Sequence, residues 1–147
     1  MAADHRETSR RVFEEIWNQK NLNAVDELMA ENYVHHDPSS PPVASGIDGY
    51  KQLVTQYLNA FPDLHFTLND QVAAGEIVVS RWTATGTHSG DLPGIPRTGR
   101  HFSVTGMSMG RIQSGKFAEG WNNWDALGLM QQIGVVPRPG EAKVRAA

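Results

Sequence analysis

The sequence has no cysteine, no long apolar run and no concentration of charge of one sign. Without cysteine, disulfides, thiolate zinc sites and a thiol nucleophile are excluded. No run is apolar and long enough to cross a bilayer, and the first residues lack the apolar segment of a secretion signal. The formal net charge is −3 and no basic patch is visible, so nucleic acid and anionic membranes are not expected as partners. We therefore expect a cytoplasmic protein.

The composition is that of a single folded domain. The chain has 147 residues, of which 39% are hydrophobic and 20% are charged. This length is enough to bury one core but too short for two domains. We expect the domain to span residues 1–136. After Pro137 the sequence is charged and rich in alanine, so residues 137–147 are expected to form a disordered tail.

The spacing of apolar residues changes between the two halves of the chain. In the first half they recur every three or four positions, which predicts helices over residues 4–19, 22–29 and 47–61, with a short strand at 33–34. In the second half they alternate with polar residues, which predicts strands over 64–69, 77–87, 101–112 and 116–122, followed by a helix over 125–132 that Gly134 ends. The predicted fold class is α+β, with N-terminal helices packed on a curved antiparallel sheet and a cavity between them.

One stretch concentrates polar and aromatic side chains between an apolar strand and an apolar helix. Residues 119–125 contain two acids, two amides and two tryptophans. This mixture is typical of the wall of a ligand pocket, because a few polar groups then orient a ligand that aromatic surface holds.

Several segments resemble a known family when they are taken together. They are Asn32–Pro38, Phe61–Leu64, Arg81–Gly90, Gly94–Gly99, Gly115 and Lys116 with Glu119 and Trp121, and Asp125 with Gln132–Gly134. In order and spacing, from about residue 8 to residue 134, they resemble the SnoaL-like polyketide cyclases of the NTF2-like superfamily. The resemblance implies a cone-shaped α+β barrel with a deep apolar pocket, a homodimer or homotetramer formed through the sheet, and a cofactor-free aldol closure of an aromatic polyketide.

The sequence departs from the family at three polar pocket positions. In the cyclases that this chain resembles, an aspartate acts as general acid and base at the position that aligns with Asn122. A glutamine and a histidine usually stand at the positions of Gly106 and Ser108. Because an amide does not exchange a proton near pH 7, the proton relay of the family is absent at Asn122.

Two adjacent histidines are the candidates for a replacement base. His35 and His36 follow each other on the predicted strand, so only one of them can face the cavity. Histidine titrates near neutral pH and needs little tuning to act as a base. The resemblance places an amide at His35, whereas many members without an assigned substrate carry a histidine at His36. Consecutive side chains diverge, so a metal site at these histidines and Asp37 is not expected.

The neighbouring acids have both functional and structural interpretations. Asp125 could serve as a base if burial raised its pKa, but it directly precedes a predicted helix and could instead cap that helix. Glu119 could be a pocket carboxylate, or it could pair with Lys116 or Arg111 at the surface or at a subunit interface. His88 could close the pocket or bind a polar ligand group, or it could hydrogen-bond the neighbouring loop.

The remaining candidates would hold the substrate. They are Trp17, Tyr57, Phe61, Trp82, His88, Phe102, Ser108, Glu119 and Trp121. Aromatic surface exceeds polar groups in this set, which favours an apolar or flat aromatic ligand. The sequence has no phosphate-binding glycine loop, so no nucleotide cofactor is expected, and no cofactor of any kind or metal is predicted.

Three functions are compatible with these features. The first is a cofactor-free enzyme that transfers a proton on a hydrophobic, polyketide-like carbonyl substrate, with His35 or His36 as base, Asp125 or Glu119 as its partner, and Asn122 orienting the carbonyl oxygen. The second is a module that binds a small apolar molecule or forms dimers without catalysis. The third, implied by the resemblance, is a cofactor-independent hydroxylase.

Overall fold

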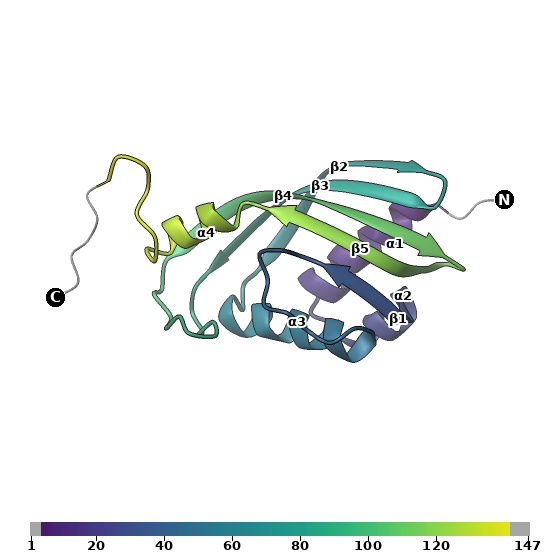
Figure 1. Cartoon of the computed structure of the whole chain (residues 1–147), viewed down its shortest axis with the longest axis horizontal. Coiled ribbons are helices and arrows are strands. Elements are labelled where there is room, and N and C mark those ends of the chain that lie inside the picture. Colours follow the sequence, from purple (N-terminus) through teal and green to yellow (C-terminus); the bar gives the residue numbers. More distant parts are fainter. Residues whose placement is uncertain (1–3, 142–147) are drawn as a thin grey trace.

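Five strands form one curved sheet, and helices cover one of its two faces (Figure 1). This computed structural model describes residues 4–141. The strands are β1 (Met29–His36), β2 (His65–Ala74), β3 (Ile77–Thr87), β4 (His101–Gln113) and β5 (Lys116–Trp124). The helices are α1 (His5–Arg11), the π-helical η1 (Val12–Asn18), α2 (Asn23–Leu28), α3 (Ile47–Ala60) and α4 (Ala126–Gln132). The α+β class and the curved sheet predicted from the sequence are confirmed.

The strand order places the first strand of the chain beside the last one. The order across the sheet is β1-β5-β4-β3-β2. The pairs β2–β3, β3–β4 and β4–β5 are antiparallel, whereas β1 runs parallel to β5. The prediction of an antiparallel sheet is therefore wrong at this edge. Apolar alternation identifies a strand and its buried face, but it carries no information on which strand becomes its neighbour or in which direction.

The hairpin and helix ends predicted from glycine positions are confirmed. Ser114 and Gly115 both have positive φ, at 52° and 78°, as a two-residue hairpin turn between β4 and β5 requires. Gly134 has φ of 89° beyond the end of α4, which fits a left-handed helix cap.

The predicted N-terminal helix is present, but its second half winds more widely than an α-helix. η1 directly continues α1, and the backbone N–H of Gln19 bonds the carbonyl of Glu14 at 2.9 Å, five residues earlier. The apolar residues Val12, Phe13, Ile16 and Trp17 are all buried. All four side chains therefore belong to the core, where they meet both the sheet and the neighbouring helices.

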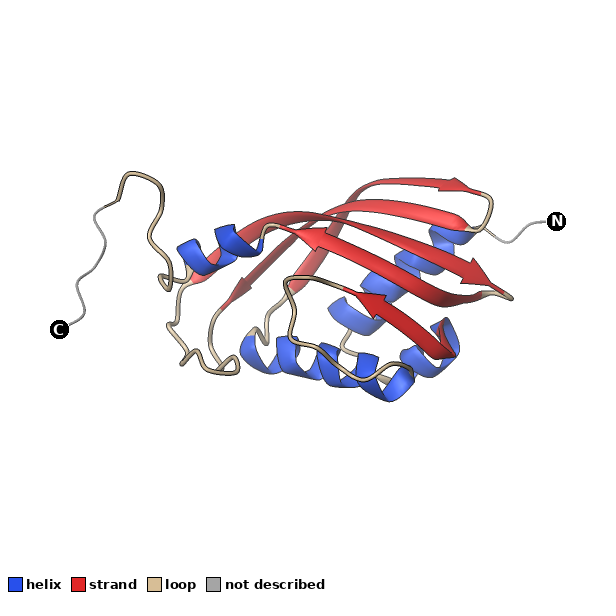
Figure 2. Ribbon diagram, in the orientation of Figure 1, coloured by secondary structure: helices blue, strands red, loops and turns tan. Residues whose placement is uncertain are grey.

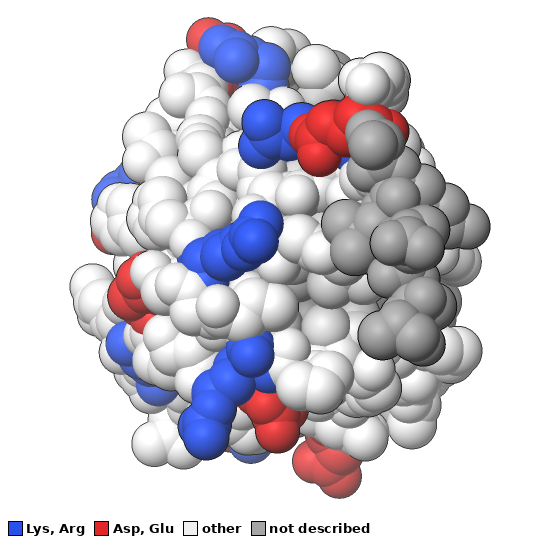
Figure 3. All heavy atoms as spheres, turned by 90° about the vertical axis from the view of Figure 1, so that its left-hand side faces the viewer, with Lys and Arg blue, Asp and Glu red and all other residues white. Residues whose placement is uncertain are grey.

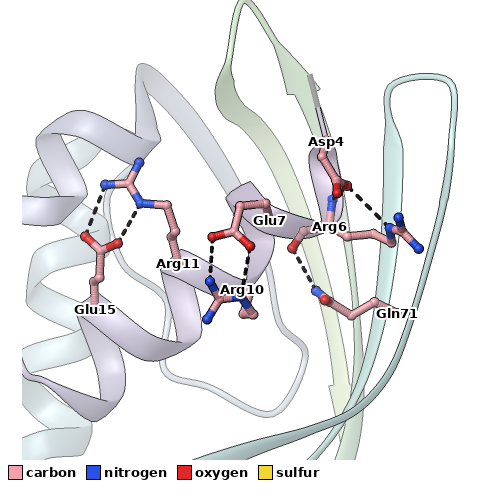
Figure 4. A network of polar contacts seen from close by, with 7 residues as sticks. All are labelled: Asp4, Arg6, Glu7, Arg10, Arg11, Glu15 and Gln71. Atoms are coloured by element: carbon pink, nitrogen blue, oxygen red, sulfur yellow. Dashed lines mark hydrogen bonds and ion pairs between the residues drawn. The ribbon is translucent and has the colours of Figure 1, made fainter. Parts of the chain in front are cut away.

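Polar contacts fix the N-terminal helix over the sheet. Figure 4 shows Gln71 of β2 donating to the backbone carbonyl of Arg6 at 3.2 Å, beside ion pairs along the helix that include Arg11 with Glu15 at 2.6 Å. A buried hydrogen bond of 3.1 Å joins Ser9 of α1 to Ser80 of β3. A buried hydroxyl pair of this kind has a defined geometry, so it sets where α1 crosses the strands.

The core lies between the helices and the inner, concave face of the sheet (Figure 2). Even-numbered residues of β3 and β4 point inward and are largely buried, while odd-numbered residues point outward. At the end shown in Figure 3, Lys and Arg side chains are separated by uncharged residues, with acidic residues beside several of them. Among residues 4–141, no helix is long and apolar enough to span a bilayer. Of the tail expected at 137–147, residues 142–147 lie outside the described part.

Position 106 has no room for a side chain, because a tryptophan ring packs against the backbone there. A Cβ at this position would overlap the Trp82 ring and lie 2.7 Å from the Cβ of Trp124. The indole of Trp82 therefore occupies the space into which a side chain at position 106 would project.

We expect Gly106→Ala to lower the free energy of unfolding by about 1–3 kcal/mol, because overpacking forces rings out of their preferred positions. Denaturant unfolding monitored by tryptophan fluorescence measures this change. Thr105→Ser, on the outer face of the same strand, serves as the control and should change stability by less than about 0.5 kcal/mol. Equal stability of the two variants would contradict the packing described for Trp82.

Candidate active site

A cavity of about 120 Å³ lies between the inner face of the sheet and the helices. Its apolar wall includes side chains from η1, α3, the residue that ends α3 and three strands, namely Trp17, Tyr57, Phe61, Trp82, Phe102 and Trp124. Trp82, Phe102 and Trp124 come from three neighbouring strands, and the pairing of these strands places all three side chains on the inner face of the sheet. The wall is mainly aromatic, as the sequence predicts.

A chain of hydrogen bonds crosses the cavity wall from β3 to β1. Trp82 Nε1 donates to Ser108 Oγ at 2.9 Å. The Ser108 hydroxyl donates to Asn122 Oδ1. Asn122 Nδ2 lies 3.1 Å from His35 Nε2, and His35 Nδ1 lies 2.9 Å from the Tyr33 hydroxyl. Ser108 and Asn122 are direct partners across β4 and β5, so the strand register brings them together.

This chain defines which nitrogen of His35 carries the proton. Because the Asn122 oxygen accepts from Ser108, its nitrogen faces His35 and donates to Nε2. Nε2 therefore presents a lone pair, and Nδ1 carries the proton that is donated to the oxygen of Tyr33.

Burial keeps the imidazole of His35 neutral. Desolvation lowers the pKa of His35 below its ordinary value of 6.5; the charge of Asp37 opposes this shift, and His36 adds to it. Desolvation also raises the pKa of Tyr33 well above its ordinary value. Near neutral pH the site thus contains a neutral imidazole beside a protonated phenol.

The structure brings most of the predicted site residues together around this cavity. Those that line it are His35, Asn122, Trp17, Tyr57, Phe61, Trp82, Phe102 and Ser108. His35 and Asn122 lie within hydrogen-bonding distance of each other. A neutral imidazole and an amide donor therefore lie together at one largely apolar space.

His36, Glu119 and Trp121 lie on the outer face of the sheet and do not line the cavity. His36 Nε2 lies 2.7 Å from Glu119, and its ring stacks on Trp121 at an interplanar angle of 17°. Arg111 also pairs with Glu119, at 3.3 Å. The hydrogen bond with His36 lowers the pKa of Glu119, although desolvation acts in the opposite direction. The pairing of Glu119 with Arg111 is one of the two interpretations left open by the sequence.

Asp125 and His88 do not line the cavity, and each accepts a hydrogen bond from the backbone. Asp125 Oδ1 accepts the backbone N–H of Gly128 at 2.8 Å and so caps α4. His88 is fully buried, and its Nδ1 accepts the backbone N–H of Thr98 at 3.2 Å in the loop before β4. Its ring also packs on Phe61, with centroids 5.6 Å apart.

Sequence reasoning missed Asp37 and Trp124 as neighbours in the cavity. Asp37 lines the cavity and accepts from Trp124 Nε1 at 3.2 Å. It also caps the loop after β1 through the Ser39 N–H at 2.9 Å. Asp37 comes two residues after His35, and residues two apart in an extended chain share a face. This spacing could have placed Asp37 on the same side as His35.

Within residues 4–141, no group of three or more His, Asp or Glu side chains has the arrangement needed to hold a metal ion. His35 and His36 diverge to opposite faces of β1, as alternation requires.

The chain is similar to known proteins over most of its length. The family described as "SnoaL-like polyketide cyclase" matches residues 7–133. The structure of TsrD from Streptomyces laurentii is similar, with 31% identity, a TM-score of 0.81, and coverage of 92% of this chain and 100% of that chain. A putative polyketide cyclase from Acidithiobacillus ferrooxidans shows 31% identity and a TM-score of 0.80, with 90% and 96% of the two chains covered.

A third similar structure is that of a putative hydroxylase. AclR, a putative hydroxylase from Streptomyces galilaeus, shows 25% identity and a TM-score of 0.76 over 92% of this chain and 89% of that chain. No curated protein matches the chain at a significant level.

Proposed function

Since the chain belongs to the SnoaL-like polyketide cyclase family, we propose that it is a cofactor-free enzyme that transfers a proton on a hydrophobic, polyketide-like carbonyl compound. The observation that carries this proposal is the neutral His35 beside Asn122 in a mainly aromatic cavity. Aromatic walls offer water few hydrogen-bonding partners, so a polar contact made inside such a cavity is stronger than one made in bulk water.

His35 is the general base in this proposal. Its Nε2 lone pair receives the Asn122 N–H in the structure. When the substrate carbonyl enters, Asn122 donates to the carbonyl oxygen instead, and Nε2 becomes free to take a proton from the adjacent carbon. The electrons of the broken C–H bond move into an enolate, whose oxygen is held by Asn122.

The proton then returns by one of two routes. In an isomerisation, the imidazolium gives its proton back at another carbon of the enolate. In an aldol closure, the enolate carbon attacks a second carbonyl of the same molecule, and the resulting alkoxide takes the proton from His35. In both routes His35 acts first as base and then as acid, whereas the cyclases that the chain resembles use an aspartate at the position of Asn122.

One observation favours a non-catalytic binding module as the second candidate. The Nε2 lone pair of His35 already accepts a hydrogen bond from Asn122. If this hydrogen bond also persists when a ligand is bound, His35 does not act as a base. A third candidate, a hydroxylase like the one named for AclR, would consume oxygen during turnover. The cytoplasmic location also stays a prediction.

We also propose that the protein forms a homodimer through the outer face of the sheet. Met107 and Met109 on this face are 55% and 36% exposed, and Val34 on β1 is 38% exposed. Trp121 lies on the same face, stacked on His36. Exposed apolar side chains gathered on one sheet face are typical of a subunit interface.

The proposed base can be tested without the natural substrate. β-Tetralone, a bicyclic ketone, exchanges its α-hydrogens for deuterium when a base removes them, and NMR follows the rate. We expect His35→Ala to reduce enzyme-accelerated exchange by about 10²–10⁴-fold, as is usual for the loss of a general base. His36→Ala, on the outer face, is the matched control and should exchange at the wild-type rate. Equal rates for wild type and His35→Ala would show that His35 is not the base.

The pH dependence of the exchange reaction follows from the protonation of His35. Burial disfavours its charged form, so the pKa lies below 6.5 and the base is neutral at pH 7. We expect kcat/KM to be flat near neutral pH and to fall on the acid side with a midpoint below 6.5. Activity that increases as the pH falls through this range would contradict the assignment.

The interface proposal predicts a change of mass in solution. Met107→Lys places a charge on the outer face and should convert a dimer into a monomer, as measured by size-exclusion chromatography with light scattering. Gln52→Lys, on the exposed side of α3, is the control and should leave the dimer intact. A monomeric wild type would refute the proposed interface.

A further inference from the structure

A second polar cluster lies at the cavity, where the chain leaves β1 and passes near α3 and the end of β5. It consists of Asp37, Ser40, Tyr57 and Trp124. Asp37 Oδ2 accepts from Ser40 Oγ at 2.7 Å and from Trp124 Nε1 at 3.2 Å. The Tyr57 hydroxyl lies 2.6 Å from Ser40 Oγ. Asp37, Tyr57 and Trp124 line the cavity.

The direction of each hydrogen bond in this cluster follows from counting protons. Ser40 has a single hydroxyl proton, which it donates to Asp37. Ser40 Oγ must therefore accept from Tyr57, so that donation runs from Tyr57 through Ser40 to Asp37. Desolvation raises the pKa of Tyr57 to about 12, which keeps the phenol protonated for this role.

The cluster retains acceptor capacity but has no free donor. A carboxylate offers about four lone-pair positions. Asp37 uses three of them, for the Ser39 N–H, Ser40 Oγ and Trp124 Nε1. The Tyr57 oxygen also keeps its lone pairs, because its proton points to Ser40.

The charge of the cavity is unbalanced at this cluster. Among the described lining residues, Asp37 supplies the one carboxylate, and no Lys or Arg is present. All three donors to Asp37 are neutral groups. An anionic ligand group placed here would meet an uncompensated negative charge, whereas a hydrogen-bond donor would complete the carboxylate's contacts.

We propose that Asp37 and Tyr57 form an anchoring subsite for a hydrogen-bond donor carried by an aromatic ligand, either a hydroxyl or an ammonium group. This inference rests on the proposed function, because it defines a second contact for the molecule on which His35 acts. His35 and Asp37 are two residues apart and both line the cavity, so their Cα atoms are about 6–7 Å apart along the chain direction. His35 and Asp37 would therefore contact the same substrate molecule, His35 at the carbon that loses the proton and Asp37 at the donor group.

Three naphthalene derivatives separate the contributions to binding. β-Naphthol carries a hydroxyl donor, β-naphthylmethylamine carries an ammonium group, and β-methoxynaphthalene has the same ring without a donor. Their affinities for the full chain are measured by isothermal titration calorimetry or by quenching of tryptophan fluorescence. We expect wild type to bind at least one of the two donor ligands about ten-fold or more tightly than β-methoxynaphthalene, as is usual for a hydrogen bond to a charged acceptor.

Two variants test whether this preference originates at the cluster. Asp37→Asn should bring the affinity of the preferred donor ligand to within about two-fold of that of β-methoxynaphthalene, because the negative acceptor is lost. Tyr57→Phe should weaken the same preference while Asp37 remains in place. Asp70→Asn is the matched control, since Asp70 pairs with Arg81 at an exposed site away from the cavity. Melting curves establish that each variant is folded.

The ligand-binding measurements do not depend on catalysis. His35→Ala should retain the ligand preference even if it abolishes exchange on β-tetralone, so failure of the proposed reaction and failure of the subsite give different results. Preference for β-naphthol alone would identify the donor as a hydroxyl, and preference for the amine would identify it as a cation. Equal binding of all three ligands to wild type, no saturable binding of the donor ligands, or a preference unchanged in Asp37→Asn would overturn the proposal.

Discussion

One chain of hydrogen bonds links four neighbouring strands and determines the chemistry of the cavity. It passes from Trp82 on β3 to Ser108 on β4, then to Asn122 on β5 and His35 on β1. Because buried polar groups must be paired, the orientation of each side chain depends on the one before it. Trp82 fixes the direction of the serine, the serine fixes the amide, and the amide fixes the histidine.

This arrangement separates two kinds of surface on one sheet. Inward side chains build an aromatic cavity that contains a neutral imidazole, whereas on the outward face Glu119 pairs with both His36 and Arg111. Two adjacent histidines on β1 thus have opposite environments. Desolvation favours the uncharged form of the inner one, and that form is required of a general base. The same inner face brings Asp37 next to this base as a negative acceptor.

Much of this fold follows from local patterns, but the site depends on pairings that local patterns do not specify. Alternation in the sequence predicts that His35 and His36 face opposite sides, yet it does not select which one faces inward. That choice depends on the parallel pairing of β1 with β5, which joins residues far apart in the sequence, such as His35 with Gly120. The capping interpretation of Asp125 was available from its place before a helix. The overlap of Trp82 with position 106 was not, because it depends on how one ring packs across strands.

The central claim is that His35 is a neutral base with its lone pair on Nε2. Long-range ¹H–¹⁵N correlation NMR on the histidine side chains tests it directly, because the nitrogen shifts distinguish the two tautomers from the cation. We expect His35 at pH 7 to carry its proton on Nδ1, with a titration midpoint below 6.5. A proton on Nε2, or a midpoint at or above 6.5, would contradict the account.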